Sequence, residues 1–196
     1  NVFYNMPVRT IEAWIPDFTT KDFYYGRISI ENGRITGLQK LRPGESGEKD
    51  RAGKYILPGL VDSHVHIESS MLTPSEFARE AIRHGTVACV SDPHEIANVL
   101  GEAGIEYMFR DAQGVPLKIY FTAPSCVPAT KSEDSGADLG SDELREMDDR
   151  YNFIALGEMM NFPGVIHGDP KMLAEMAVSD PAAFSQLVEV SRSGKT

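Results

Sequence analysis

The hydrophobic and polar positions divide the chain into a β-rich beginning and a longer stretch in which strands alternate with helices. Apolar or β-branched runs that read as buried strands cover residues 56–66, 86–90, 117–123 and 153–157. Helical periodicity follows them, at 73–84, 96–112, 141–150, 171–178 and 181–192. Alternation of this kind predicts a parallel sheet covered by helices.

Two of the helical segments carry signals for where they begin or break. Thr73 can cap the first helix, Pro74 suits its first position, and Glu76 would complete a capping box. Gly101 and Gly104 interrupt the pattern of 96–112, so two shorter helices or a bend are expected there.

The residues before Ile56 follow a β pattern instead. Two runs, 23–30 and 34–38, flank Asn32-Gly33, a pair typical of short hairpin loops. The predicted domains are therefore 1–55, a small β segment of a composite side domain, and 56–196. The second holds about four β/α units, whereas a TIM-like (β/α)8 barrel needs eight strands in roughly 250 residues. The fold prediction is thus α/β, the first half of such a barrel.

The end of the first predicted strand carries the clearest chemistry. His64 and His66 are separated by one residue, so on a strand both imidazoles point to the same face. The carboxyl end of a barrel strand is the active-site mouth, where two such histidines form half of a metal site. Two hydrogen-bonded structural histidines are the alternative, which the strand context disfavours.

Polar side chains also follow the other three predicted strands. Asp92 and His94 follow the second, Cys126 the third and Glu158 the fourth. His94 is suited to touch substrate, assist a metal or cap the next helix. Cys126 is placed to line a pocket, and a buried structural carboxylate is the alternative for Glu158.

Three further polar residues follow the histidine pair directly. Glu68, Ser69 and Ser70 are candidates to contact substrate or to hydrogen-bond the metal ligands. The alternative is a loop that is polar because its own backbone groups need partners.

Composition narrows the class of protein. The chain has 196 residues, a net charge of -10 and a pI of about 4.9. This acidic balance argues against a nucleic-acid-binding surface and favours a protein that acts on small molecules. Its 2 cysteines give no disulfide framework, and neither a signal peptide nor a long apolar span is visible. A cytoplasmic protein with no membrane contact is therefore expected.

The run 56–66 resembles the first barrel strand of the amidohydrolase superfamily, in which the H-x-H pair supplies two metal ligands. Within that superfamily, four motifs in order resemble the adenine deaminase family of bacteria and archaea. They are residues 64–70, 91–101, 124–130 and 156–161.

The resemblance implies a metal-dependent reaction of purine salvage and adenine catabolism. His64 and His66 would bind one ion of a divalent pair, Mn or Fe with Zn also suitable, and Glu158 would bridge the pair where many relatives use a carboxylated lysine. A metal-activated water would attack C6 of adenine, giving hypoxanthine and ammonia. The implied partner is the purine base. Separately, four β/α units leave open sheet edges at the first and fourth strands, which predicts self-association into a homo-oligomer.

Relatives also carry two more metal histidines on later strands and a proton-transfer aspartate on the last one, which is expected beyond residue 196. No catalytic residue is therefore assigned within this chain, and the chain alone is predicted to be inactive. Two alternatives stay open: a non-catalytic fragment or assembly half, and a cyclic-amide hydrolase of the same superfamily. The absence of lysine from the fourth-strand motif disfavours the latter.

Overall fold

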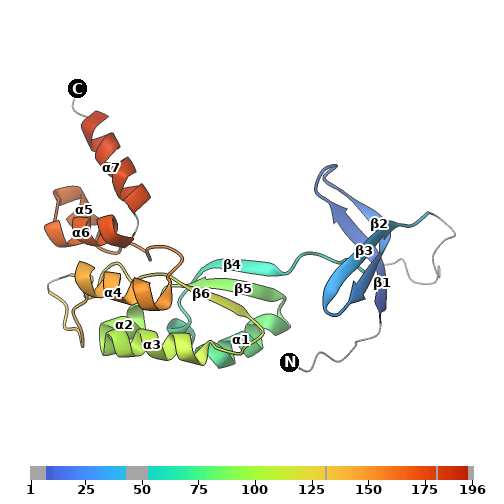
Figure 1. Cartoon of the computed structure of the whole chain (residues 1–196), viewed down its shortest axis with the longest axis horizontal. Coiled ribbons are helices and arrows are strands. Elements are labelled where there is room, and N and C mark those ends of the chain that lie inside the picture. Colours follow the sequence, from blue (N-terminus) through green and yellow to red (C-terminus); the bar gives the residue numbers. More distant parts are fainter. Residues whose placement is uncertain (1–7, 43–52, 131, 180, 194–196) are drawn as a thin grey trace. The chain divides into compact units, whose positions relative to one another are not determined.

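The computed structural model describes residues 8–42, 53–130, 132–179 and 181–193 (Figure 1). The contacts divide the chain into two compact units, Asn1–Pro58 and Gly59–Thr196.

The first unit contains an antiparallel sheet in the order β1-β2-β3. Its strands are β1 Arg9–Asp17, β2 Asp22–Glu31 and β3 Arg34–Lys40. The predicted hairpin is confirmed, since Asn32 and Gly33 both adopt positive φ, as the tight turn between β2 and β3 requires. The strand β1 was not predicted, although Ala13 and Ile15 alternate on its buried face.

The second unit is built on a parallel sheet in the order β4-β5-β6 (Figure 1). Its strands are β4 Leu60–Val65, β5 Thr86–Ser91 and β6 Lys118–Phe121. The predicted fourth strand is wrong as a full strand, because residues 153–157 form only one isolated parallel bridge, Ala123↔Leu156. That segment holds a single β-branched residue and ends in Gly157, so its intrinsic preference for extended pairing is weak.

Seven α-helices and a short 3-10 helix complete the described part of the second unit. They are η2 Glu68–Ser70, α1 Pro74–Arg83, α2 His94–Leu100, α3 Glu102–Asp111, α4 Ser141–Tyr151, α5 Phe162–His167, α6 Pro170–Ser179 and α7 Pro181–Ser193. The expected break in the helical segment 96–112 is confirmed, and Gly101 makes it with a φ of 60°. The helix α5 was not predicted; the side chain of Asn161 caps it by accepting from the amide of Gly164.

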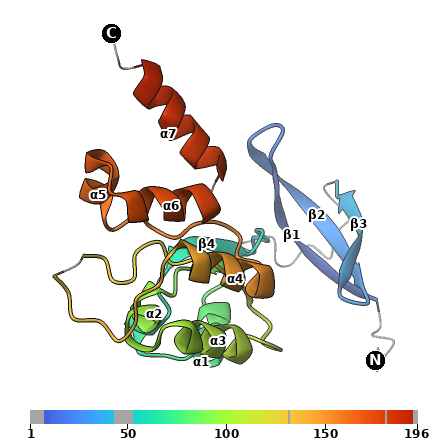
Figure 2. The same cartoon turned by 60° about the vertical axis from the view of Figure 1, so that its left-hand side comes forward.

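The helices α1 and α3 cover one face of the parallel sheet (Figure 2). Ala78 of α1 and Met108 of α3 pack there against Cys89 of β5 and Phe121 of β6. A second apolar cluster joins α2, α3 and α4 below the loop that follows β6. The first of these two apolar clusters fixes the positions of β4 and β5, and with them the polar residues that follow each strand.

The start of α1 is capped differently from the sequence prediction. Thr73 is the N-cap residue, but its side chain makes no capping hydrogen bond. Instead, the carboxylate of Asp111, at the end of α3, accepts from the amide of Ser75 at 2.8 Å. The capping box proposed for Thr73 and Glu76 is therefore wrong, because a carboxylate from another helix supplies the acceptor.

Within the described residues, no helix combines the length and the apolar character needed to cross a membrane.

Candidate metal centre

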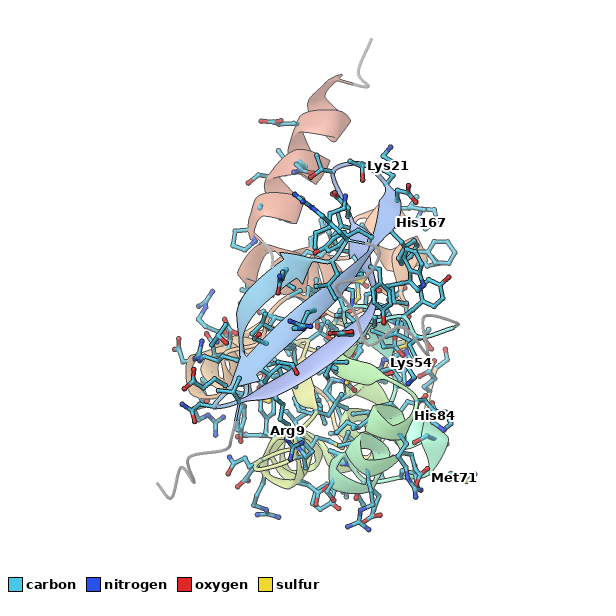
Figure 3. All side chains as sticks on the ribbon, turned by 90° about the vertical axis from the view of Figure 1, so that its right-hand side faces the viewer. Arg9, Lys21, Lys54, Met71, His84 and His167 are labelled. Carbon is cyan, nitrogen blue, oxygen red and sulfur yellow. The ribbon has the colours of Figure 1, made fainter. Side chains whose placement is uncertain are left out.

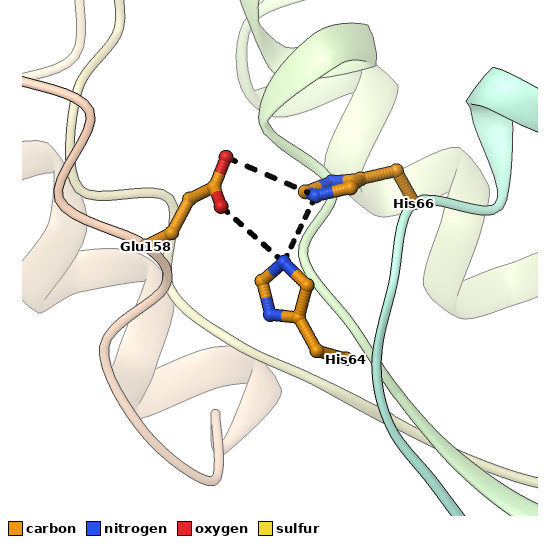
Figure 4. Close-up of side chains that lie close together, drawn as sticks. All are labelled: His64, His66 and Glu158. Carbon is orange, nitrogen blue, oxygen red and sulfur yellow. Dashed lines mark hydrogen bonds and ion pairs between the residues drawn. The ribbon is translucent and has the colours of Figure 1, made fainter.

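Three side chains converge beyond the carboxyl ends of the parallel strands. His64 and His66 come from the end of β4, and Glu158 follows the bridge that pairs with Ala123 (Figure 4). Nε2 of His64 lies 3.0 Å from Nε2 of His66 and 3.3 Å from Oε2 of Glu158. Nε2 of His66 lies 3.8 Å from the other oxygen, Oε1. The structure thus brings together three residues that sequence alone singled out.

The ring of His66 is oriented by the main chain. Its Nδ1 lies 3.0 Å from the carbonyl oxygen of Asp92. A carbonyl can only accept, so Nδ1 carries the proton and Nε2 of the neutral ring keeps its lone pair. That lone pair faces His64 and Glu158, which is the orientation a metal ligand requires.

The spacing of the two imidazoles fits one shared ion. Metal–nitrogen bonds of about 2.0–2.1 Å place two ligand nitrogens roughly 2.9–3.4 Å apart at angles between square and tetrahedral. The observed 3.0 Å between the Nε2 atoms of His64 and His66 falls in that range. Two imidazoles and a carboxylate also suit first-row divalent ions. The donor set therefore fits a divalent metal.

Asp92 holds the segment that carries Glu158. Its side chain is 2% exposed, and Oδ2 accepts from the amide of Glu158 at 2.9 Å. The backbone amide of Asp92 in turn donates to the carbonyl of Val65 on β4. A side chain at Gly157 would place Cβ within 2.5–2.7 Å of the Asp92 carboxylate, so only glycine permits this approach. Asp92 is thus a support for the site's geometry.

His94 lies beside this support, at the start of α2. Its Nδ1 is 3.3 Å from Oδ2 of Asp92, and its ring packs against that of His66 at 4.6 Å between centroids. The carboxylate of Asp92 raises the pKa of His94, partly offset by the burial of the ring. The Nε2 of His94 faces Glu158 at 4.0 Å. His94 therefore joins the cluster.

Glu95 is a residue that sequence reasoning missed. His66, His94 and Glu95 form a second group with ligand atoms close enough to hold an ion, sharing His66 with the first. The signal was present in the segment Ser-Asp-Pro-His-Glu, where Glu95 directly follows His94.

The three polar residues after the histidine pair contact α2 and their own loop. Oε1 of Glu68 lies 3.3 Å from the amide of Ile96, a donor in the first turn of α2, and burial raises the pKa of Glu68. Ser69 donates to Glu95 at 2.5 Å, and Ser70 donates to the carbonyl of Ile67. Glu68 and Ser69 thus anchor the start of α2, and Ser70 stabilises the loop.

A pocket of about 280 Å³ opens beside the cluster. Cys126 lines it, as the sequence suggested, together with the start of α2. Its lining residues are His94, Glu95, Asn98, Cys126, Ala129, Glu133 and Met160. A larger hollow of about 550 Å³ adjoins it and shares Ala129 and Glu133.

The two other histidines lie outside the cluster. His84 at the end of α1 and His167 at the end of α5 are both exposed, and Figure 3 labels them. They provide matched controls for the site histidines.

Comparison with known proteins gives a consistent result. Residues 55–179 match the Amidohydrolase family. The chain is 50% identical over 161 residues to an adenine deaminase of Sulfurovum sp. (strain NBC37-1), covering 82% of the chain and 29% of the relative. It is 58% identical over 149 residues to an adenine deaminase of Salinibacter ruber, covering 76% and 26%. For the adenine deaminase of Methanosarcina barkeri the identity is 48% over 169 residues, covering 86% and 29%. The chain thus spans less than a third of each relative.

Proposed function

Because this chain belongs to the amidohydrolase family, we propose that it supplies the metal-binding part of a hydrolase that converts adenine to hypoxanthine and ammonia. The observation that carries the proposal is the convergence of His64, His66 and Glu158 in a chain homologous to adenine deaminases. The proposed substrate is inferred from the names of those relatives, whereas the proposed metal site rests on the geometry of this chain.

His64, His66 and Glu158 would hold a divalent ion, Mn²⁺ or Fe²⁺ with Zn²⁺ also suitable. When bound, such an ion supplies Lewis acidity that makes a water molecule nucleophilic near neutral pH. Glu158 presents one oxygen toward each imidazole, so its carboxylate would complete the ligand set of the ion that His64 and His66 share.

The residues around the ligands orient them and handle protons. The carbonyl of Asp92 accepts from Nδ1 of His66 and so leaves Nε2 as the ligand nitrogen of that ring, and the carboxylate of Asp92 fixes the backbone at Glu158. The carboxylate of Asp92 raises the pKa of His94, which shifts the ring that lines the pocket toward its protonated form. In the proposed reaction, His94 would give this proton to the leaving amine.

The pocket beside the cluster suits a planar base with a polar edge. Adenine presents ring nitrogens that accept hydrogen bonds and an amino group that donates them. Glu95 and Asn98 supply carboxylate and amide groups on the lining, and Ala129 and Met160 supply apolar surface. Contacts of both kinds are typical of small-molecule sites.

Metal titration tests the site directly. Mn²⁺, Fe²⁺ and Zn²⁺ are added anaerobically to the chain, to the double variant His64→Ala/His66→Ala, and to Glu158→Gln. We expect weak binding by the parent chain, because only three of the expected ligands are present, and loss of binding in both variants. The controls His84→Ala and His167→Ala should bind like the parent. Unchanged binding in the double variant would remove these histidines from the site, and submicromolar binding of two ions per chain would contradict the weak affinity.

An activity assay tests the substrate. Ammonia and hypoxanthine are measured with the chain alone and with a polypeptide carrying the remainder of a relative's sequence. We expect no product from the chain alone and recovery in the mixture, abolished by His64→Ala. If the chain alone forms product, the prediction that it needs the later metal histidines and the proton-transfer aspartate is wrong. A metal-loaded mixture that ignores adenine but opens hydantoin would move the function to cyclic-amide hydrolysis, and one that does neither would favour a non-catalytic role.

A further inference from the structure

Three sulfur atoms lie together beside the metal centre and have no part in the proposed reaction. The thiol of Cys126 is 3.3 Å from Sδ of Met159 and 3.8 Å from Sδ of Met172. Cys126 and Met172 are buried, at 1% and 3% exposure, and Met159 is half-buried. The three side chains come from the loop after β6, the segment after Glu158 and α6. The fold therefore assembles this cluster from distant parts of the sequence.

We propose that Cys126, Met159 and Met172 form a binding site for a soft monovalent cation, Cu(I). Thiolate and thioether sulfurs are soft donors that select Cu(I), whereas carboxylate and carbonyl oxygens suit harder ions such as Mn²⁺. The sulfur cluster and the His64–His66–Glu158 group therefore differ in the class of ion that each prefers. The proposal that Cu(I) binds at the sulfur cluster does not depend on the adenine reaction proposed above.

The sulfur spacing is close to that of a metal site. Metal–sulfur bonds of about 2.3 Å place neighbouring sulfurs roughly 3.8–4.0 Å apart in tetrahedral or trigonal geometry. The distance of 3.8 Å from Cys126 to Met172 already fits. Met159, at 3.3 Å, needs to move outward by about half an ångström, which its flexible side chain can do.

The charge of the site also favours a monovalent ion. Binding requires the thiolate, so the Cys126 thiol releases its proton to solvent as the ion enters. One thiolate and two neutral thioethers then balance a single positive charge, and the buried site carries no net charge. Access is provided by the pocket of about 280 Å³, because Cys126 lines it.

Ordinary packing of sulfur-containing side chains is the alternative, and Cys89 supplies the comparison. Cys89 is as buried as Cys126, and burial raises the pKa of its thiol to about 11. In the part of the chain that the structure describes, no methionine sulfur is in hydrogen-bond contact with Cys89, whereas Cys126 contacts two. If the methionine sulfurs are ligands, Cu(I) should bind at Cys126 and not at Cys89.

The experiment titrates the reduced chain anaerobically with Cu(I) against a chromophoric Cu(I) chelator, and in parallel with Ag(I) as a redox-inert probe. The background is His64→Ala/His66→Ala, which removes the competing imidazoles. We expect one ion per chain and an ultraviolet sulfur-to-metal absorption band. Cys126→Ser should abolish both signals, Met159→Leu and Met172→Leu should each weaken binding by at least about tenfold, and Cys89→Ser should change nothing.

Two results would overturn the proposal. One is binding that persists in Cys126→Ser. The other is parental affinity in both leucine variants, which would reduce the site to a solitary thiol. Methionine-to-leucine exchanges conserve core volume, so the leucine variants test the proposal even if Cys126→Ser fails to fold, as judged by circular dichroism.

Discussion

The buried carboxylate of Asp92 accepts a hydrogen bond of 2.9 Å from the backbone amide of Glu158, 66 positions later in the sequence. Asp92 follows β5, and Glu158 follows the single bridge that joins residue 156 to Ala123. Backbone hydrogen bonds from Ile154 and Gly157 hold the preceding segment against residues 121–123, and the Asp92 contact extends this support to the carboxylate ligand.

The first prediction concerns the glycine that permits this contact. In Gly157→Ala, the new methyl group would lie within 2.5–2.7 Å of the buried Asp92 carboxylate, which has no room to turn away. We expect a loss of about 1–3 kcal/mol in the free energy of unfolding, together with weaker metal binding, because Glu158 is displaced. Denaturant unfolding and metal titration measure the two effects.

Gly37→Ala is the matched control for that variant. A Cβ at Gly37 would lie 3.6 Å from Ser29, an ordinary contact distance. Its metal binding should equal that of the parent chain. If Gly157→Ala behaves like Gly37→Ala in both measurements, the close packing of Asp92 does not constrain Glu158.

The second prediction distinguishes the observed cap of α1 from the one expected from sequence. Asp111→Ala removes the acceptor of the Ser75 amide and should cost about 1 kcal/mol, whereas Thr73→Ala should cost less. That amide lowers the pKa of Asp111. The stabilisation is therefore present above the carboxyl's ordinary pKa and is lost as pH falls through the lowered value. Chemical denaturation of both variants at acidic and neutral pH measures this, and a larger loss in Thr73→Ala would restore the original assignment.

The third prediction follows from the buried carboxyl of Glu175 on α6. Neither of its oxygens has a hydrogen-bond partner in the described structure, and burial raises its pKa to about 8. The folded chain then holds a proton that the unfolded chain releases, so stability should fall as pH rises from about 4.5 to about 8. The loss should be up to about 5 kcal/mol, because one pKa unit corresponds to about 1.4 kcal/mol and the raised pKa already includes the opposing effect of Lys171.

Glu175→Gln removes the titrating group while keeping the volume of the side chain. Its unfolding free energy, measured across the same pH range, should be flatter than that of the parent chain. Parallel pH profiles for the two proteins would show that Glu175 is ionised or solvated in the folded state.

The fourth prediction concerns association through β4, an edge strand of the described parallel sheet. Leu60 and Val61 are 60% and 64% exposed on this strand, and an exposed apolar edge is a template for pairing with another chain. We expect the chain to self-associate and Val61→Lys to reduce the associated fraction. Size-exclusion chromatography with light scattering measures both, and a parent chain that stays monomeric at all concentrations would contradict the homo-oligomer expectation.

Local patterns predicted the parts of the fold that depend on local sequence. The hairpin turn at Asn32 and Gly33 and the helix break at Gly101 each follow from residues with special backbone freedom. The convergence of His64 with His66 follows from the alternation of side chains at the end of β4.

Contacts between distant residues were beyond that reasoning. The cap of α1 by Asp111 depends on how α3 packs, and the contact of Cys126 with Met172 depends on the position of α6. Glu158 was identified because it follows a predicted strand, but that segment forms no continuous strand. The Glu158 amide donates to the distant Asp92 carboxylate, and the Glu158 carbonyl accepts from the Ser125 hydroxyl.

The orientation of His66 has a consequence for how this site tolerates mutation. The acceptor of its Nδ1 proton is the main-chain carbonyl of residue 92, which every amino acid provides. Pro93 restricts that residue to extended backbone conformations whatever its side chain. Exchanges at position 92 therefore leave the acceptor of the His66 ring in place even where they disturb Glu158. Substitutions at position 92 should therefore disturb the placement of Glu158 more than that of His66.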